Sequence, residues 1–181
     1  ADRVHHMDQQ LIECELITGE KKLVPADQLV FRPAAYALVY DAPNLLLVNT
    51  KSTGKWFFPG GAIEKGEKAE DSLRREVQEE TGIELSGVSF FLFKESFFYY
   101  EPHDVGYHCL NLFFTATPKS EGSIPHKQHD PTDEADTYDW MDIHTLQPSS
   151  MQSFGGEILE GFRARLNQIS ALNEIFIHSA E

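Results

Sequence analysis

The feature that most constrains the fold is a helical segment in which acidic residues share the spacing of apolar ones. Residues 68–81 are predicted to form this helix, and Gly82 follows it at the position where helices commonly end. At about 100° per residue, Ala69, Leu73 and Val77 fall within one arc of about 80°. These three side chains are therefore predicted to form the buried stripe that packs the helix against the rest of the chain.

Three glutamates overlap this stripe or continue along its edge. Relative to the centre of the stripe, Glu80 lies at about −20°, Glu76 at about −60° and Glu79 at about −120°. A solvated acidic face is the alternative, but a carboxylate that faces the core is costly without a partner. The chain already carries a formal net charge of −14, so more like charge in one place needs a specific reason. A divalent cation such as Mg²⁺ supplies one, and it suits displacement at phosphorus.

The same segment resembles the signature of the Nudix hydrolases, G-x5-E-x7-R-E-U-x-E-E-x-G-U, in which U is a bulky aliphatic residue. Gly61 is followed after five residues by Glu67, and after seven more by the run from Arg75 to Ile83. Every fixed position of the signature is filled. The resemblance implies an α+β chain with the Nudix fold, an α/β/α sandwich around a central mixed β-sheet.

The resemblance also implies an activity, the hydrolysis of a pyrophosphate bond in a nucleoside diphosphate linked to a second moiety, X, with Mg²⁺ or Mn²⁺ as cofactor. It leaves X open among (d)NTPs, ADP-ribose or sugar nucleotides, and dinucleoside polyphosphates. The implied metal ligands are the carboxylates of Glu76, Glu79 and Glu80, the backbone carbonyl of Gly61, and Glu67. For Glu67, a structural contact to the helix N-terminus is an equal alternative.

Catalytic roles follow from the same resemblance. Glu79 or Glu76 is expected to orient or deprotonate the attacking water, and Arg75 is expected to position the acids through bidentate hydrogen bonds. The long polar loop 118–134 is either a solvated acidic loop or the source of a further catalytic acid, Glu134 or Asp133.

Outside this signature, the sequence offers weaker candidates for substrate binding. Arg32 and Lys51 are expected to offset phosphate charge, with an ordinary surface position as the alternative. Phe58 is expected to line the pocket, and Tyr99 is expected to stack on a base. Core packing is the alternative for the rings and is preferred for Phe97, which lies near Tyr99.

The remaining elements are predicted from short apolar runs and turn residues. Strands are expected at 11–17, 29–41, 44–50, 88–100, 107–117 and 135–143, a loop at 52–61, and a second helix at 156–169. Strands and helices mixed without a regular βαβ rhythm indicate an α+β class. Residues 1–28 are predicted to be an N-terminal extension containing a strand, and 29–181 the Nudix domain, with the signature at 61–83.

Composition excludes several classes. An excess of Asp and Glu, 29 against 15 Lys and Arg, disfavours a nucleic acid polymer as partner, and a small-molecule nucleotide is expected instead. The chain has no apolar run of about 18 residues, which predicts no membrane partner. No signal-peptide h-region is found at the N-terminus, which predicts a cytoplasmic protein. The sequence leaves the oligomeric state open, a homodimer included.

Two alternative functions are compatible with a Nudix-like signature. A nucleotide sensor with the Nudix fold but no turnover is expected to lose an acid of the signature or to carry a DNA-binding domain, and this chain shows neither. An isopentenyl-diphosphate-isomerase-like enzyme would need a catalytic cysteine near the site. Cys14 and Cys109 are the only cysteines, too few and too far apart for a disulfide framework or a zinc site. Cys109 is expected to be a core residue in mid-strand.

Overall fold

A computed structural model describes residues 10–119 and 137–178, with the backbone alone for 174–178. The chain forms two compact units. The first comprises residues 1–40 and 59–125, and the second comprises residues 41–58 and 126–181. The whole of the acidic signature lies in the first unit.

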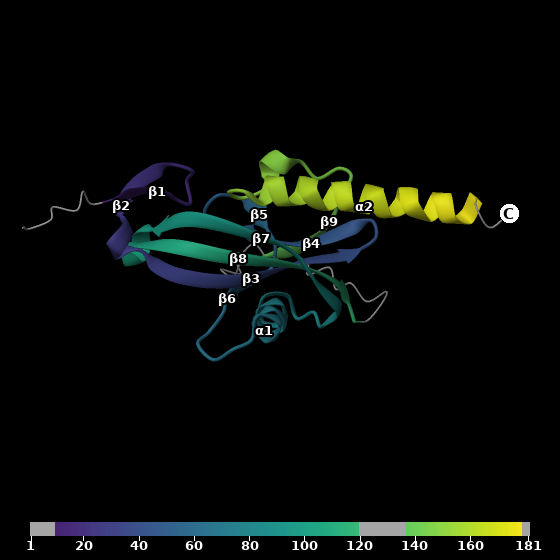
Figure 1. Ribbon diagram of the computed structural model, residues 1–181, viewed down its shortest axis with the longest axis horizontal. Helices are drawn as coiled ribbons and strands as arrows, with labels where there is room; N and C mark the ends of the chain where they lie inside the picture. The colour runs from purple at the N-terminus through teal and green to yellow at the C-terminus, as the bar shows by residue number, and fades with distance from the viewer. Residues whose placement is uncertain (1–9, 120–136, 179–181) are drawn as a thin grey trace, which may run out of the picture. The chain divides into compact units, whose positions relative to one another are not determined.

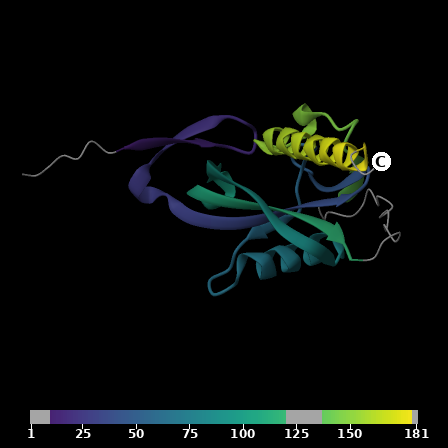
Figure 2. The same ribbon diagram turned by 45° about the vertical axis from the view of Figure 1, so that its right-hand side comes forward.

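The first unit is built on a mixed sheet. Its strands are β1 (Leu11–Glu15), β2 (Lys21–Pro25), β3 (Val30–Asp41), β6 (Gly60–Ala62), β7 (Leu85–Tyr100) and β8 (Val105–Pro118). β8 pairs antiparallel with β7 and parallel with β3, and β6 pairs antiparallel with β3. β1 and β2 form an antiparallel pair that joins β7 through β1 (Figures 1 and 2). Short 3₁₀ turns lie at Ala26–Gln28 and Glu101–His103.

The two faces of this sheet differ in burial. Along β8, Cys109, Asn111 and Phe113 are at most 5% exposed and point to one face. The alternate residues, from His108 to Leu112, are half-buried on the other face. β3 pairs in parallel with β8 without a shift in register from Val30 to Val39, and residues 34–39 of β3 include fully buried side chains on both faces.

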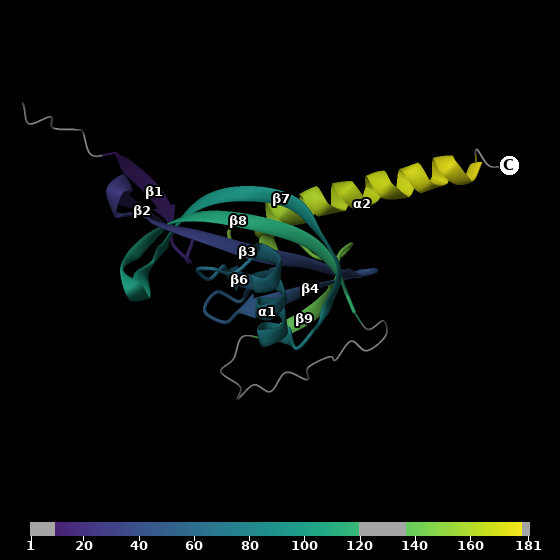
Figure 3. The ribbon, with the colours of Figure 1, turned by 60° about the horizontal axis from the view of Figure 1, so that its bottom comes forward.

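Helix α1 (Ala69–Thr81) packs on the sheet near β6 and β7 (Figure 3). Leu73 and Val77 are fully buried, as predicted, whereas Ala69 is only half-buried. Ser72 and Thr81 are buried instead. They can be, because their hydroxyls donate to backbone carbonyls, Ser72 to Ala62 at 3.1 Å and Thr81 to Val77 at 2.7 Å.

The predicted end of α1 is confirmed. Gly82 adopts the left-handed conformation, with φ of 72°, and its N–H donates to the carbonyl of Gln78 at 2.9 Å. A residue with a Cβ would be strained there, so the glycine both ends the helix and satisfies one of its last carbonyls.

The second unit has a small antiparallel sheet and a long helix. β4 (Asn44–Thr50) pairs with β5 (Lys55–Phe57) and with β9 (Tyr138–Asp142). A 3₁₀ turn (Pro148–Ser150) precedes α2 (Gly155–His178). The guanidinium of Arg163 in α2 donates to the carbonyls of Ile143 and Leu146, which fixes the helix to the turn after β9. None of the helices in the described residues is both long and apolar enough to cross a membrane.

Most predicted elements are present, and four details were wrong. The N-terminal region holds a second strand, β2. The predicted loop 52–61 contains β5 and part of β6. The second helix runs to His178 rather than to residue 169, and β9 starts later than predicted. β5 and β6 have three residues each, too few to show a periodic pattern in the sequence. They are strands because β5 pairs with β4 and β6 pairs with β3. Most of the predicted loop 118–134 lies outside the described residues.

Candidate active site

Two carboxylates of α1 converge on the backbone of β6. A carboxylate oxygen of Glu80 accepts a hydrogen bond from the N–H of Gly60 at 2.9 Å. The carboxylate of Glu76 lies against the next residue, because a Cβ added to Gly61 would be 2.7 Å from Cδ of Glu76. Glu76 and Glu80 are four residues apart and therefore lie on the same face of the helix. Gly61 can sit this close to an acid only because it has no side chain.

Arg75 links the acids of the signature into one network. Its guanidinium makes two bonds to Glu67, at 2.9 and 3.0 Å, one to Glu76 at 2.8 Å and a longer one to Glu79 at 3.3 Å. The side chains of Glu67 and Glu76 are 18% and 19% exposed, whereas that of Glu79 is 60% exposed. One cation thus holds two sheltered carboxylates and reaches a third that faces water.

The hydrogen bonds of Arg75 shift the pKa of one of its partners, Glu67. They lower the pKa of Glu67 from 4.5 to about 2, with a smaller contribution from the N–H of Glu64. Its bonds to Glu67 and then Glu76 raise the pKa of Arg75 above its ordinary value. Glu67 also accepts from the N–H of Glu64 at 3.1 Å, so it ties the loop to the helix. This geometry fits the structural alternative for Glu67.

The acids at the end of α1 oppose the helix dipole. Its last turn contains no basic residue, although the C-terminal end of a helix carries partial negative charge. Glu79 and Glu80 therefore lie where negative charge is least favourable in a helix. The same position attracts a cation, which would relieve this repulsion.

The predicted burial of Glu80 was wrong. Its residue is exposed, because the side chain extends to the N–H of Gly60 at the edge of the sheet instead of entering the core. Within the described parts of the chain, no three His, Cys, Asp or Glu side chains are already grouped as a metal site. The bonds from Arg75 hold Glu76 and Glu79 toward the guanidinium.

Arg32 lies on the face of β3 opposite to Ala35 and Glu76, whereas the charge of Glu80 acts on Tyr36, which shares the face of Arg32. Side chains alternate along the strand, and Ala35, the partner of Gly61, shares its face with Phe31 rather than with Arg32. Burial lowers the pKa of Arg32, but Tyr36 and Cys109 raise it by more, so the net pKa lies above the ordinary value. Arg32 is therefore half-buried and bonded to its own strand and to β8, which disfavours the predicted phosphate contact.

Tyr99 does not present its ring for stacking. It is 5% exposed and packs with Cys14, Leu16 and Val24. Its hydroxyl donates to Asp104, and the ammonium of Lys22 lies 3.7 Å from the centre of its ring. The structure therefore supports the core-packing alternative for Tyr99 over base stacking.

The other predicted substrate contacts lie in the second unit. Phe58 is 1% exposed and packs edge-on against Phe57 at 5.4 Å between ring centres. A side chain with so little free surface does not line a pocket, so its predicted role is corrected to packing. Lys51 is exposed and stays a candidate. The predicted acid Glu134 lies outside the described residues.

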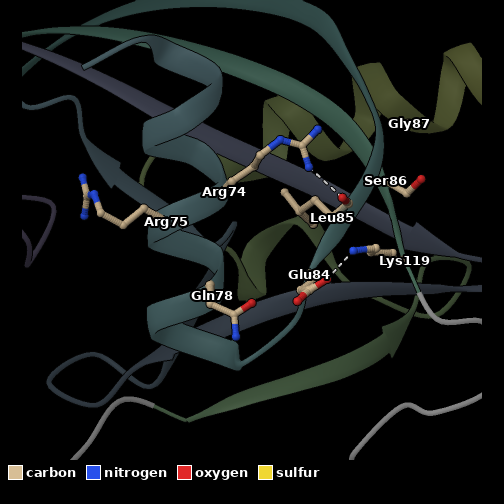
Figure 4. A pocket seen from close by; sticks show the side chains of 8 residues that line it. All are labelled: Arg74, Arg75, Gln78, Glu84, Leu85, Ser86, Gly87 and Lys119. Carbon is tan, nitrogen blue, oxygen red and sulfur yellow. Dashed lines mark hydrogen bonds and ion pairs between the residues drawn. The ribbon is translucent and has the colours of Figure 1, made fainter. Parts of the chain in front are cut away.

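A surface hollow of about 650 Å³ lies between α1 and the start of β7 and is lined by Arg74, Gln78, Leu85 and Lys119 among others. Arg74 donates to the carbonyl of Leu85 at 2.6 Å, and Lys119 pairs with Glu84 at 2.8 Å, whereas Arg75 points away from the other lining side chains (Figure 4). Arg74 is also paired with Glu70 at 2.7 Å. The cations of this hollow are therefore already paired, and Arg75 is the one lining residue that also belongs to the carboxylate network.

The comparison with known families agrees with this geometry. The model of the NUDIX domain matches residues 30–162, which include β3, the signature and the start of α2. The chain belongs to the NUDIX domain family. The fold of the chain is similar to that of solved Nudix structures, among them a NUDIX hydrolase from Nitrosomonas europaea. That structure is 19% identical, covers 75% of this chain and 90% of its own, and superposes with a TM-score of 0.56.

Two relatives illustrate the range of the family. YvcI of Bacillus subtilis, an uncharacterized Nudix hydrolase, is 31% identical over 65% of this chain and 70% of its own length. The human mitochondrial NAD(P)H pyrophosphatase NUDT13 is 30% identical over 41% of this chain, but the match spans only 23% of NUDT13. Our Nudix chain is accordingly a hydrolase of the pyrophosphohydrolase class, a class whose members generally use divalent metals.

Proposed function

We propose that this Nudix hydrolase cleaves the pyrophosphate bond of a small-molecule nucleoside diphosphate linked to X, with Mg²⁺ or Mn²⁺ as cofactor. The observation that carries the proposal is the convergence of Glu76 and Glu80 on Gly60 and Gly61. A glycine backbone beside two carboxylates leaves room for phosphate oxygens to approach a cation closely.

The donors at this point fit a hard divalent cation. They are carboxylate oxygens of Glu76, Glu79 and Glu80 and the backbone carbonyl of Gly61, with no sulfur or imidazole among them. These groups would hold the cation, and Glu67 would support the loop through Arg75. When bound, the cation neutralises phosphate charge and lowers the pKa of water.

The chain's own residues supply the remaining steps. Arg75 orients Glu76 and Glu79 and neutralises part of their charge before substrate arrives. Glu79, at 60% side-chain exposure, faces water, and we assign it as the group that accepts the proton of the attacking water. Glu134 stays a proposed second acid.

The two alternative functions receive no support from the described residues. All acids of the signature are present on α1 and its preceding loop, which favours turnover over sensing. Cys109 is 5% exposed, and burial raises the pKa of its thiol. A buried neutral thiol is a poor catalytic group, so the isomerase alternative is disfavoured.

The identity of X, a cytoplasmic location, a homodimer and a domain boundary at residue 29 remain predictions. NUDT13 is named for its action on NAD(P)H, but the match covers too little of that protein to transfer its substrate. We therefore treat NAD(P)H only as one more substrate to test, in addition to the three substrate classes that the sequence leaves open.

The test is a product-release assay across (d)NTPs, ADP-ribose, sugar nucleotides, NADH and dinucleoside polyphosphates. We expect hydrolysis with Mg²⁺ or Mn²⁺ and none in EDTA. Melting curves give a second readout, in which Mg²⁺ should raise the melting temperature of the wild type but not that of Glu80→Gln. Glu70→Gln is the matched control, because Glu70 is an exposed acid of the same helix paired with Arg74.

Hydrolysis that persists in EDTA would contradict the metal requirement. No hydrolysis of any substrate, combined with retained nucleotide binding, would favour the sensor. An equal Mg²⁺ shift in Glu80→Gln and the wild type would place the cation elsewhere.

A further inference from the structure

The converging carboxylates account for the phosphates of a substrate but for no part of a nucleoside. A row of three aromatic rings crosses the same sheet from β3 through β8 to β7. Phe31 pairs in register with His108, and His108 pairs with Phe97. The ring centres are 5.0 and 4.6 Å apart, and the ring planes are inclined by 32° and 36°. Each neighbouring pair therefore overlaps through inclined faces rather than meeting edge-on.

The outermost ring of this row is open to solvent. Phe31 is 70% exposed, the largest exposed fraction among the exposed large apolar side chains of the described residues. His108 and Phe97 are half-buried beside it on the next two strands. Phe97 also packs against the buried cluster of Cys14, Leu16, Val24 and Tyr99, which agrees with the core packing predicted for it. An aromatic ring held open on a sheet gains free energy when another flat ring covers it, because apolar surface leaves water and the two π-systems stack.

The row lies on the face of the sheet that carries the acids. Phe31 and Ala35 point to the same side of β3, since four residues separate them. Ala35 pairs with Gly61, and the direction of the missing Cβ of Gly61 leads to the carboxylate of Glu76. At about 3.3 Å per residue, the row is about 13 Å along β3 from this point. A nucleoside diphosphate is an elongated molecule with its base and its phosphates at opposite ends, so it can span this interval.

We infer that the row of Phe31, His108 and Phe97 stacks the base of the nucleotide whose pyrophosphate the acids cleave. This assignment rests on the proposed function. Open sheets that bind single-stranded nucleic acids use the same device, aromatic side chains on neighbouring strands that stack on bases without a deep cleft. Glu95 lies at the rim, 3.1 Å from Nε2 of His108 and 55% exposed, where its carboxylate can accept from the amino group of a base.

A second copy of the chain is the competing occupant of this face. The row is three strands wide, about 10 Å, and one ring deep. A stable protein interface buries about 800 Å² on each partner, far more than three rings provide. A single flat ring matches the dimensions of the row better.

The test compares a ligand with a base and a ligand without one. α,β-Methylene-ADP and methylenediphosphonate both resist hydrolysis at the bridging position, and only the first carries adenine. In the presence of Mg²⁺, calorimetry should show that Phe31→Ala weakens the binding of α,β-methylene-ADP by roughly tenfold or more. The binding of methylenediphosphonate should be unchanged, and Phe31→Trp should restore the affinity for the nucleotide.

Phe90→Ala is the matched control. Phe90 is 56% exposed on β7 and packs edge-on with Phe114, which lies about 20 Å along β8 from His108. This control should bind both ligands like the wild type. Unchanged nucleotide affinity in Phe31→Ala, or an equal loss in Phe90→Ala, would overturn the assignment. A change in the mass measured by light scattering with unchanged nucleotide affinity would instead identify a second copy as the occupant.

These outcomes are separable from failure of the proposed function. If the base row is wrong, the wild type still hydrolyses a nucleotide with Mg²⁺ and binds methylenediphosphonate. If the proposed function is wrong, no pyrophosphate bond is cleaved, whatever Phe31→Ala does to nucleotide binding.

Discussion

The acidic end of α1 and the cluster around Tyr99 belong to the same unit and are built in opposite ways. Around α1, Arg75 holds carboxylates that remain partly open to water, and the helix ends without a base to offset them. Around Tyr99, a buried ring packs on Cys14 and Val24, and its one polar atom is bonded to Asp104. The first region keeps unfavourable charge available for a ligand. In the second, the hydroxyl of the buried ring is already hydrogen-bonded to a side chain of the protein.

The two regions therefore serve different purposes, ligand binding and catalysis around α1 and stability around Tyr99. Residues of the acidic region should change rate or metal binding with little loss of stability. Residues of the Tyr99 cluster should do the reverse. Four substitutions or conditions test this division, beginning with the largest expected effect.

Glu79→Gln should lower kcat by roughly 10²–10⁴-fold for whichever nucleotide is the substrate, with a smaller change in KM. The amide cannot accept the proton of the attacking water, yet it can keep a hydrogen bond to Arg75. Steady-state kinetics measures the effect, with Glu70→Gln as the control. An unchanged kcat would move the catalytic acid to loop 118–134, and Glu134 would be the next residue to substitute.

Tyr99→Ala should reduce the free energy of unfolding by about 3 kcal/mol, because it leaves a cavity among buried side chains. Urea denaturation measures this change. The kcat of the folded fraction should match that of the wild type, as expected for a packing residue. A loss of kcat without a loss of stability would show that Tyr99 contacts the substrate. It would also contradict the structural role assigned to this cluster.

Gly61→Ala should lower kcat by roughly ten- to a hundredfold while the melting temperature changes little. The added Cβ would lie 2.7 Å from Cδ of Glu76. The flexible side chain of Glu76 can move aside, which keeps the fold intact but displaces its carboxylate from the site. Gly60→Ala is the contrast, because its Cβ would lie 2.1 Å from the backbone oxygen of Ala35 at a φ of +144°. This second variant should lose stability. Equal melting temperatures for both variants would contradict the distinction.

The smallest expected effect concerns pH. The folded-state pKa of Glu67 is lowered to about 2 from 4.5, so its stabilising contribution is present above pH 4.5 and is lost as the pH falls toward 2. Glu67→Gln should therefore flatten the dependence of the melting temperature on pH across this window. Melting curves from pH 2 to 6 measure it. A pH dependence equal to that of the wild type would show that Arg75 does not hold this carboxylate in solution.

The sequence could predict what depends on local spacing. The residues from Gly61 to Ile83 were enough to predict the family, the helix and its end at Gly82. A helix cap and a helical period depend only on residues close together in the sequence. The apolar run at 44–50 gave the bounds of β4 for a similar reason, since it is enclosed by turn residues.

The roles of single side chains outside the signature depended on tertiary structure. Whether Tyr99 and Phe58 face a ligand or the core is decided by which strands pair and in which register, and a sequence period cannot show this. The same holds for Arg32, which alternation places on the face away from Gly61, and for Glu80, whose long side chain reaches Gly60 across the chain. The sequence by itself determined the helix, its acids and the class of chemistry. Only the tertiary structure decided which backbone these acids meet and that Phe31, His108 and Phe97 share a face, because both depend on pairing between strands far apart in the chain.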